Sequence, residues 1–167
     1  FIHKNYPRTR SVLRATLEYA AATLDSLASQ FGEGHQEEIR KMTADDAKRW
    51  IRANFGFLAA DAKGRLAIDG DAKALEVAID EPGFFRGALA RAGEERTAKQ
   101  ALGLLARRVP EGPGPDATAA AWKKFLDSDA PFLFFSETGG YVWRIDPLAK
   151  RRKVPTAELR GVKRADP

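Results

Sequence analysis

The stretch Thr43–Ala78 reads TADDAKRWIRANFGFLAADAKGRLAIDGDAKALEVA, and its hydrophobic pattern changes period within a few residues. Thr43 followed three residues later by Asp46 is a variant of the capping box that starts many helices. The helix that follows has one apolar face, formed by Ala47, Trp50, Ile51 and Phe55. Beyond Gly56, residues 65–69 alternate between polar and apolar, as in a half-buried strand. The stretch therefore predicts a helix, a small β-hairpin and a second helix.

Residues 11–31 form the clearest helical pattern upstream of this stretch. Their apolar side chains recur at alternating spacings of four and three: Leu13, Leu17, Ala20, Leu24, Leu27 and Phe31. Such a stripe suits a helix that faces a core. A coiled-coil seam has a similar spacing but needs a longer segment, so we favour the core-facing helix. A short helix is expected over residues 36–42, between the two patterns.

Downstream, short helices are expected over residues 84–92 and 94–108. Residues 110–115, PEGPGP, then exclude regular structure because proline and glycine dominate them. A helix follows Asp116. The aromatic segments 132–135 and 141–145 flank a glycine-rich turn and predict a second hairpin.

These elements predict a mainly helical α+β fold, a helical bundle with two small β-hairpins. We expect a helical domain over residues 1–109 and a linker over 110–115. A helix and the aromatic hairpin, residues 116–147, would pack on the first part. Residues 148–167 would form a basic tail, with Pro155 holding it extended.

The composition narrows the classes of protein that fit. The chain of 167 residues has no cysteine, which excludes disulfides, thiolate metal sites and cysteine catalysis. No apolar run is long enough to span a bilayer, so no membrane partner is expected. Abundant alanine and arginine favour a bacterial source, and the lack of cysteine is compatible with the cytoplasm. We expect a bacterial cytoplasmic protein.

The net charge of +5 is concentrated at the two ends of the chain. Residues 148–167 contain seven Lys and Arg residues against Glu158 and Asp166. Residues 1–14 contain four cations and no acid, so residues 15–147 are mildly acidic. Basic arms that flank a domain are a common electrostatic footprint of nucleic-acid binding. They are equally common as solvated termini.

The segment FGFLAADAKGRLAIDG, residues 55–70, resembles the end of a winged helix-turn-helix domain. In that family a recognition helix ends in an aromatic-glycine-hydrophobic step, and a two-stranded wing follows. The resemblance covers residues 43–78 and implies nucleic-acid binding, with double-stranded DNA as the partner. It places Lys48, Arg49 and Arg52 on the outer side of the recognition helix, with Lys63 and Arg65 on the wing. Many winged-helix domains bind proteins instead.

The basic tail is the second candidate contact with nucleic acid. Its cations suit phosphate contacts that read no sequence: Lys150, Arg151, Arg152, Lys153, Arg160, Lys163 and Arg164. Such binding would weaken with salt, because each neutralised phosphate releases counterions. The alternative interpretation is an unstructured tail that only keeps the protein soluble.

The hairpin Phe132–Ile145 has apolar residues on both faces, because Phe134 alternates with Leu133 and Phe135. Either the hairpin lies inside the fold, which we favour, or one face binds a protein partner or stacks on bases. The alternative function is therefore a protein–protein interaction module or a subunit of a larger assembly.

Catalytic signatures are weak, so we expect no enzyme, no cofactor and no metal. His3 and His35 have no partner at the spacing of a metal site or a catalytic triad. The acidic pairs Asp69/Asp71 and Asp127/Asp129 stand where turns and helix caps favour aspartate. An enzyme of unrecognised type is the third hypothesis.

Overall fold

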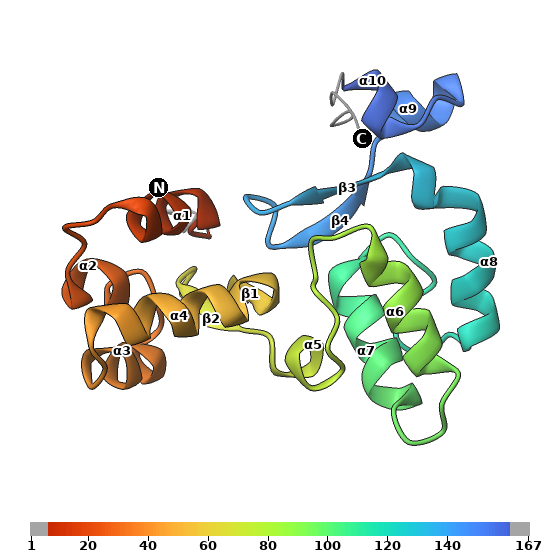
Figure 1. Cartoon of the computed structure of the whole chain (residues 1–167). Coiled ribbons are helices and arrows are strands. Elements are labelled where there is room, and N and C mark those ends of the chain that lie inside the picture. The colour runs from red at the N-terminus through yellow and green to blue at the C-terminus, as the bar shows by residue number, and fades with distance from the viewer. Residues whose placement is uncertain (1–6, 161–167) are drawn as a thin grey trace, which may run out of the picture. The chain divides into compact units, whose positions relative to one another are not determined.

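A computed structural model describes residues 7–160 of the chain. This part contains helices α1–α10 and two separate two-stranded antiparallel sheets, which confirms the predicted mainly helical α+β class (Figure 1). The chain divides into two compact units. Among the described residues, the first comprises residues 7–81 and Glu137–Tyr141, and the second comprises Pro82–Ser136 and residues 142–160. The predicted linker over 110–115 lies within the second unit.

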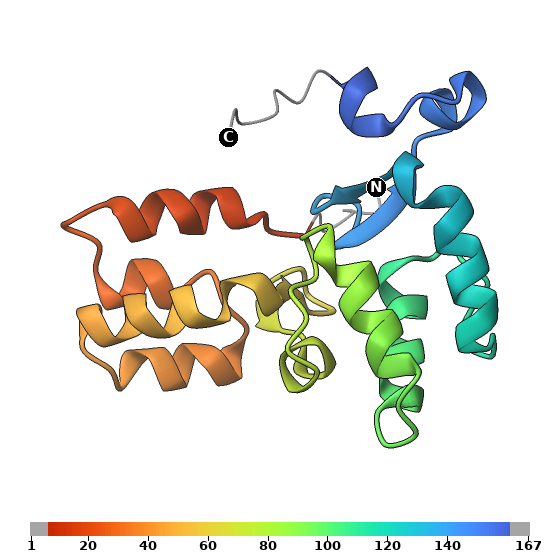
Figure 2. The same ribbon diagram turned by 45° about the vertical axis from the view of Figure 1, so that its right-hand side comes forward.

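The first unit packs short helices around one hairpin. Its elements are α1 (Arg10–Glu18), α2 (Leu24–Ala28), α3 (Glu33–Arg40), α4 (Ala44–Asn54), the 3₁₀ turn η1 (Phe55–Phe57), β1 (Leu58–Ala60), β2 (Leu66–Ile68) and α5 (Gly70–Ala74). Helices α1 to α4, coloured red to orange, lie side by side in both views (Figures 1 and 2). Their core consists of fully buried apolar side chains: Leu13, Leu27, Phe31, Ile39, Ile51, Leu58 and Leu66.

The single helix predicted over residues 11–31 is wrong, because the chain leaves the helix at Tyr19 and starts α2 after Thr23. The Thr23 hydroxyl accepts a hydrogen bond from the Ser26 N–H, and the Ser26 hydroxyl accepts one from the Thr23 N–H. This reciprocal cap stabilises a helix start at Thr23 and competes with a continuous helix. Ala20 is exposed as a result, although the rest of the apolar stripe faces the core.

Helices α3 and α4 are joined by a turn of only three residues, Lys41–Thr43. As predicted, Thr43 caps α4, since its hydroxyl accepts a hydrogen bond from the Asp46 N–H at 3.1 Å. The Asp46 side chain binds Arg49 one turn further along instead of completing the box. Helix α3 starts at Glu33, earlier than expected, because Gly32 takes the extended conformation of a helix N-cap.

The hairpin β1–β2 follows α4 through η1, as the sequence predicts. The strands pair antiparallel with Leu58 opposite Ile68 and Ala60 opposite Leu66. The Asp61 carboxylate closes the turn by accepting hydrogen bonds from the N–H groups of Lys63 and Arg65 at 2.8 and 2.9 Å. Gly64 has a φ of 75°, a conformation that favours glycine. Phe31 adds a parallel bridge to Leu66.

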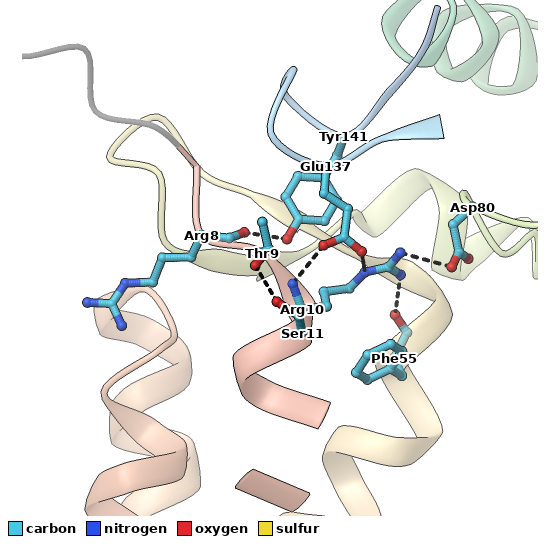
Figure 3. Close-up of polar contacts among 8 residues, drawn as sticks. All are labelled: Arg8, Thr9, Arg10, Ser11, Phe55, Asp80, Glu137 and Tyr141. Carbon is cyan, nitrogen blue, oxygen red and sulfur yellow. Dashed lines mark hydrogen bonds and ion pairs between the residues drawn. The ribbon is translucent and has the colours of Figure 1, made fainter. Parts of the chain in front are cut away.

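A buried arginine holds the turn Glu137–Tyr141 within the first unit (Figure 3). Arg10 is 2% exposed, and its guanidinium pairs with Glu137 and Asp80 at 2.9 Å each. It also donates to the Phe55 carbonyl at 3.2 Å. The Tyr141 hydroxyl donates to the Arg8 carbonyl, and burial raises the pKa of that hydroxyl. Segments that are far apart in the sequence therefore meet at one cation.

The second unit is a helical layer with a hairpin. Its elements are α6 (Gly83–Ala92), α7 (Ala98–Arg108), α8 (Ala119–Asp129), the 3₁₀ turn η2 (Ala130–Phe132), β3 (Leu133–Ser136), β4 (Val142–Ile145), α9 (Pro147–Arg152) and α10 (Thr156–Leu159). Helix α6 packs against both α7 and α8 (Figure 1). The strands β3 and β4 pair antiparallel, with Phe134 opposite Arg144 and Phe135 opposite Trp143.

Residues 110–115 have no helix or strand, as predicted. They pack against a core side chain, the Trp122 ring, and so are not a free linker. The Trp122 ring is fully buried, and its indole N–H donates to the Gly114 carbonyl at 3.2 Å. A Cβ added at Gly112 would lie 2.4 Å from Cη2 of that ring. Glycine at 112 is therefore required by close approach and not by flexibility.

Only the inner face of the β3–β4 hairpin is core, so the interpretation of a hairpin inside the fold holds for one of its two faces. Trp143 is 7% exposed, and its ring packs on Phe85 of α6 and on Phe135. Leu133 is buried on the same face. Phe134 lies on the other face, opposite Arg144, and is only half-buried.

The prediction of an extended tail is wrong for residues 148–152 and 156–159, which belong to α9 and α10. Asp146 caps α9, because its carboxylate accepts hydrogen bonds from the N–H groups of Leu148 and Ala149 at 3.0 and 3.1 Å. Pro147 occupies the first helical position, where proline is favoured. Pro155 is extended, as predicted, but only as the residue that precedes α10.

Candidate nucleic-acid interface

Helix α4 exposes Arg49 and Arg52, while Lys48 and Arg52 also donate hydrogen bonds to carbonyls at the end of α1. Arg49 is 74% exposed and pairs with Asp46, whose pKa is lowered mainly by the hydrogen bond from Arg49. Lys48 Nζ donates to the Tyr19 carbonyl at 3.2 Å, and Arg52 donates to the Leu17 carbonyl at 3.2 Å. These carbonyls end α1, where positive charge is favoured. Arg52 is nonetheless exposed, whereas Lys48 is half-buried.

Arg14 lies beside Arg52, a neighbour that the sequence analysis missed. Arg14, Leu17, Glu18, Arg52 and Phe55 line one depression of about 310 Å³. The Arg14 guanidinium lies 5.0 Å from the centroid of the Phe55 ring, within cation–π range. Only the packing of α1 on α4 brings these two arginines together. The basic count of residues 1–14 was the one signal in the sequence that pointed to Arg14.

Lys63 lies in the turn of the β1–β2 hairpin, and Arg65 directly precedes β2. Lys63 is 69% exposed and pairs with Glu33 at 3.4 Å, a surface contact that is worth little. Arg65 is half-buried. Both residues line a small depression together with Glu33 and Asp61, so the hairpin surface has mixed charge rather than purely positive charge.

The cations of the C-terminal segment belong to the second unit. Lys150 pairs with Asp129 at 2.6 Å, and Arg160 pairs with Asp146 at 3.2 Å. Arg151, Arg152 and Lys153 are exposed. Lys163 and Arg164 lie outside the described residues. The contact of α9 with α10 places the cations of residues 150–153 near Arg160.

The Asp146 carboxylate links this basic segment to the hairpin. Its pKa is lowered, first by the hydrogen bond from the Ala149 N–H and then by those from Arg160 and Leu148. An aspartate with a lowered pKa stabilises the folded state above its unfolded pKa, and this stabilisation is lost as the pH falls through the folded pKa. The stabilisation from the cap of α9 and its bond to Arg160 should therefore decrease as the pH falls below about 4 and disappear below the lowered pKa of Asp146.

Replacing Arg160 by glutamine should raise the pKa of Asp146, because one charged donor is removed. An NMR titration of the Asp146 carboxyl carbon measures this change. Lys123→Gln, on an exposed ion pair of α8 with Asp127, is the matched control and should leave the Asp146 titration unchanged. An unaltered Asp146 pKa in Arg160→Gln would show that the backbone bonds alone set it.

The residues considered for catalysis have structural partners. Asp69 caps α5 by accepting from the N–H groups of Asp71 and Ala72. His35 Nε2 accepts from the Ile68 N–H at 3.4 Å, and its ring lies against Phe31 and Trp50. His3 lies outside the described residues. Over residues 7–160 no group of three or more His, Asp or Glu side chains could hold a metal ion.

No helix within residues 7–160 has the length and apolar character that crossing a membrane requires. Comparison with protein-family models, curated proteins and solved structures finds no match to this chain. A functional assignment therefore depends on the geometry and charge of these surfaces.

Proposed function

We propose that the protein binds nucleic acid without catalysis, and that the first unit binds double-stranded DNA through α4 and the β1–β2 hairpin. One observation carries the proposal. Helix α4 follows α3 after a three-residue turn, exposes Arg49 and Arg52, and leads directly into a hairpin with Lys63 at its tip. This order of elements supports the winged-helix resemblance of residues 43–78. A helix of this kind fits the major groove, and a hairpin beside it reaches the backbone.

The electrostatic contribution should come from a few cations. Arg49, Arg52 and Lys63 would contact phosphates, with Lys48 and Arg65 nearer the protein surface. The ion pairs of Arg49 with Asp46 and of Lys63 with Glu33 are exposed and weak, so phosphates can compete with them. The C-terminal cations would add phosphate contacts that are independent of sequence.

Arg49→Glu is expected to weaken duplex binding about tenfold at low salt, because a phosphate contact is lost and a repulsion is added. Arg49→Gln should lower the slope of log K against log salt by about 1. Fluorescence anisotropy of a labelled duplex at several salt concentrations measures both changes.

The matched control is Lys99→Glu, which changes the net charge equally at an exposed position in α7 of the second unit. It should leave duplex affinity close to that of the unaltered protein. Equal effects of Arg49→Glu and Lys99→Glu would mean that only net charge matters, and the α4 proposal would then fail.

Protein binding is the second candidate function, and one observation favours it. Helices α1 and α2 line a groove of about 690 Å³ that contains Val12 and Tyr19, two large apolar side chains that are 61% and 67% exposed. The aromatic hairpin Phe132–Ile145, which the sequence suggests for this role, buries Trp143 within its own unit. Absence of duplex binding together with a concentration-dependent molecular mass would favour this function.

A further inference from the structure

The outer face of the β3–β4 hairpin combines an aromatic ring with two arginines. Phe134 and Arg144 are directly opposite each other across the strands, on the face that does not pack against Phe85. The Arg160 guanidinium lies over the Phe134 ring, 3.8 Å from its centroid. Phe134 is half-buried, whereas Arg144 is exposed. A planar cation therefore covers the ring, beside a second arginine.

Arg160 is held in this position from two directions. The Phe134 ring supports it below, and Asp146 Oδ2 accepts from its Nε at 3.2 Å. Asp146 itself is fixed as the cap of α9. The Arg160 side chain remains 49% exposed, so surface is left on it for a ligand. An arginine plane fixed in advance loses little side-chain entropy when it stacks on another flat group.

Exposed cations continue from this face onto α9. Helix α10 contacts both β3 and α9, so the segments are contiguous. Arg144, Arg151 and Arg152 make no ion pair with any residue in the range 7–160. Lys153 ends α9 with a φ of 55°, where glycine would be more favourable. A lysine at that position supplies charge at a conformational cost, which points to a use for the charge.

We propose that this surface, formed by Phe134, Arg144, Arg160 and the α9 cations Arg151–Lys153, binds unpaired single-stranded nucleic acid. The exposed guanidinium planes stack on bases, and the α9 cations contact the phosphates. A duplex suits this surface less well, because its base faces are hidden in the helical stack. The inference rests on the proposed nucleic-acid function and assigns a second form of nucleic acid to the second unit.

The test uses the full chain and a fluorescein-labelled oligo-dT of about 12 nucleotides, within the range of known single-strand sites. Arg160→Lys keeps the charge and removes the planar stacking group. It is expected to weaken oligo-dT binding about tenfold, as loss of one stacked base contact does. Arg144→Lys should act in the same direction. Phe134→Leu should also weaken binding, because Arg160 then loses its support.

The matched control is Lys124→Arg, at an exposed position on α8, which should leave oligo-dT affinity unchanged. Near-UV circular dichroism of each variant checks that the fold is retained, and Arg144→Lys, at an exposed site, keeps the test valid if Phe134→Leu unfolds. Failure of the unaltered protein to bind oligo-dT would overturn the proposal. Unchanged oligo-dT affinity in both Arg160→Lys and Arg144→Lys would also overturn it, since charge alone would then explain binding.

A duplex of the same length separates this proposal from the function proposed for the first unit. Arg160→Lys should leave duplex affinity unchanged and weaken oligo-dT binding. Arg49→Glu should show the opposite pattern. Loss of duplex binding alone would leave the single-strand surface supported, and loss of oligo-dT binding alone would leave the α4 interface supported.

Discussion

Arg10→Met is expected to lower the free energy of unfolding of the first unit by about 3 kcal/mol. The substitution leaves the Asp80 and Glu137 carboxylates without the cation that both contact at 2.9 Å. It also removes one of the two donors to the Phe55 carbonyl, which then keeps only the Leu58 N–H. Both carboxylates are about a quarter exposed, and water compensates part of the loss, so the lower end of the usual range applies. Urea unfolding followed by far-UV circular dichroism measures the change.

Arg14→Met is the control for this substitution. Arg14 lies one turn further along α1, is exposed, and contacts the Phe55 ring only through its guanidinium at 5.0 Å. Its replacement should change stability by no more than about 0.5 kcal/mol. Arg10→Lys should fall between the two, because lysine keeps the charge but lacks the planar set of donors. Equal losses for Arg10→Met and Arg14→Met would mean that the buried cluster does not stabilise the unit.

Gly112→Ala is expected to destabilise the second unit by about 2 kcal/mol, a typical cost of overpacking. The added Cβ would lie 2.4 Å from Cη2 and 2.5 Å from Cζ3 of the Trp122 ring. That ring is fully buried, so either the loop or the indole has to move. Movement of the loop would also weaken the hydrogen bond from the indole to the Gly114 carbonyl. Urea unfolding followed by near-UV circular dichroism measures the loss.

Gly103→Ala, in the same unit, is expected to have the opposite effect on stability. Gly103 lies within α7, and a Cβ added there meets no atom within 4 Å beyond its chain neighbours and the backbone of its own helix. Alanine should raise stability by about 0.5–1 kcal/mol, because glycine in a helix loses more backbone entropy on folding. An increase in stability in both Gly112→Ala and Gly103→Ala would show that residues 110–114 do not pack closely against the Trp122 ring.

The candidate interface was predictable only in part. Arg49 and Lys63 are exposed where the sequence pattern placed them, since helix phase and hairpin turns are local properties. The use of Lys48 and Arg52 against the carbonyls that end α1 was not predictable, because α1 reaches them through packing. The proximity of Arg14 to Arg52, and the stacking of Arg160 on Phe134, have the same origin.

The sequence alone determined the helix starts at Thr43 and after Asp69, and both hairpins with their turns. Capping side chains, glycine turns and hydrophobic period act over a few residues, so one segment contains all the information for them. Tertiary structure decided that Arg10 is a buried ion-pair centre, that residues 110–114 cover Trp122 and that one face of the second hairpin is core. Those outcomes depend on which distant segments meet, because a charge or a ring is stabilised by its neighbours in space and not by its neighbours in the chain.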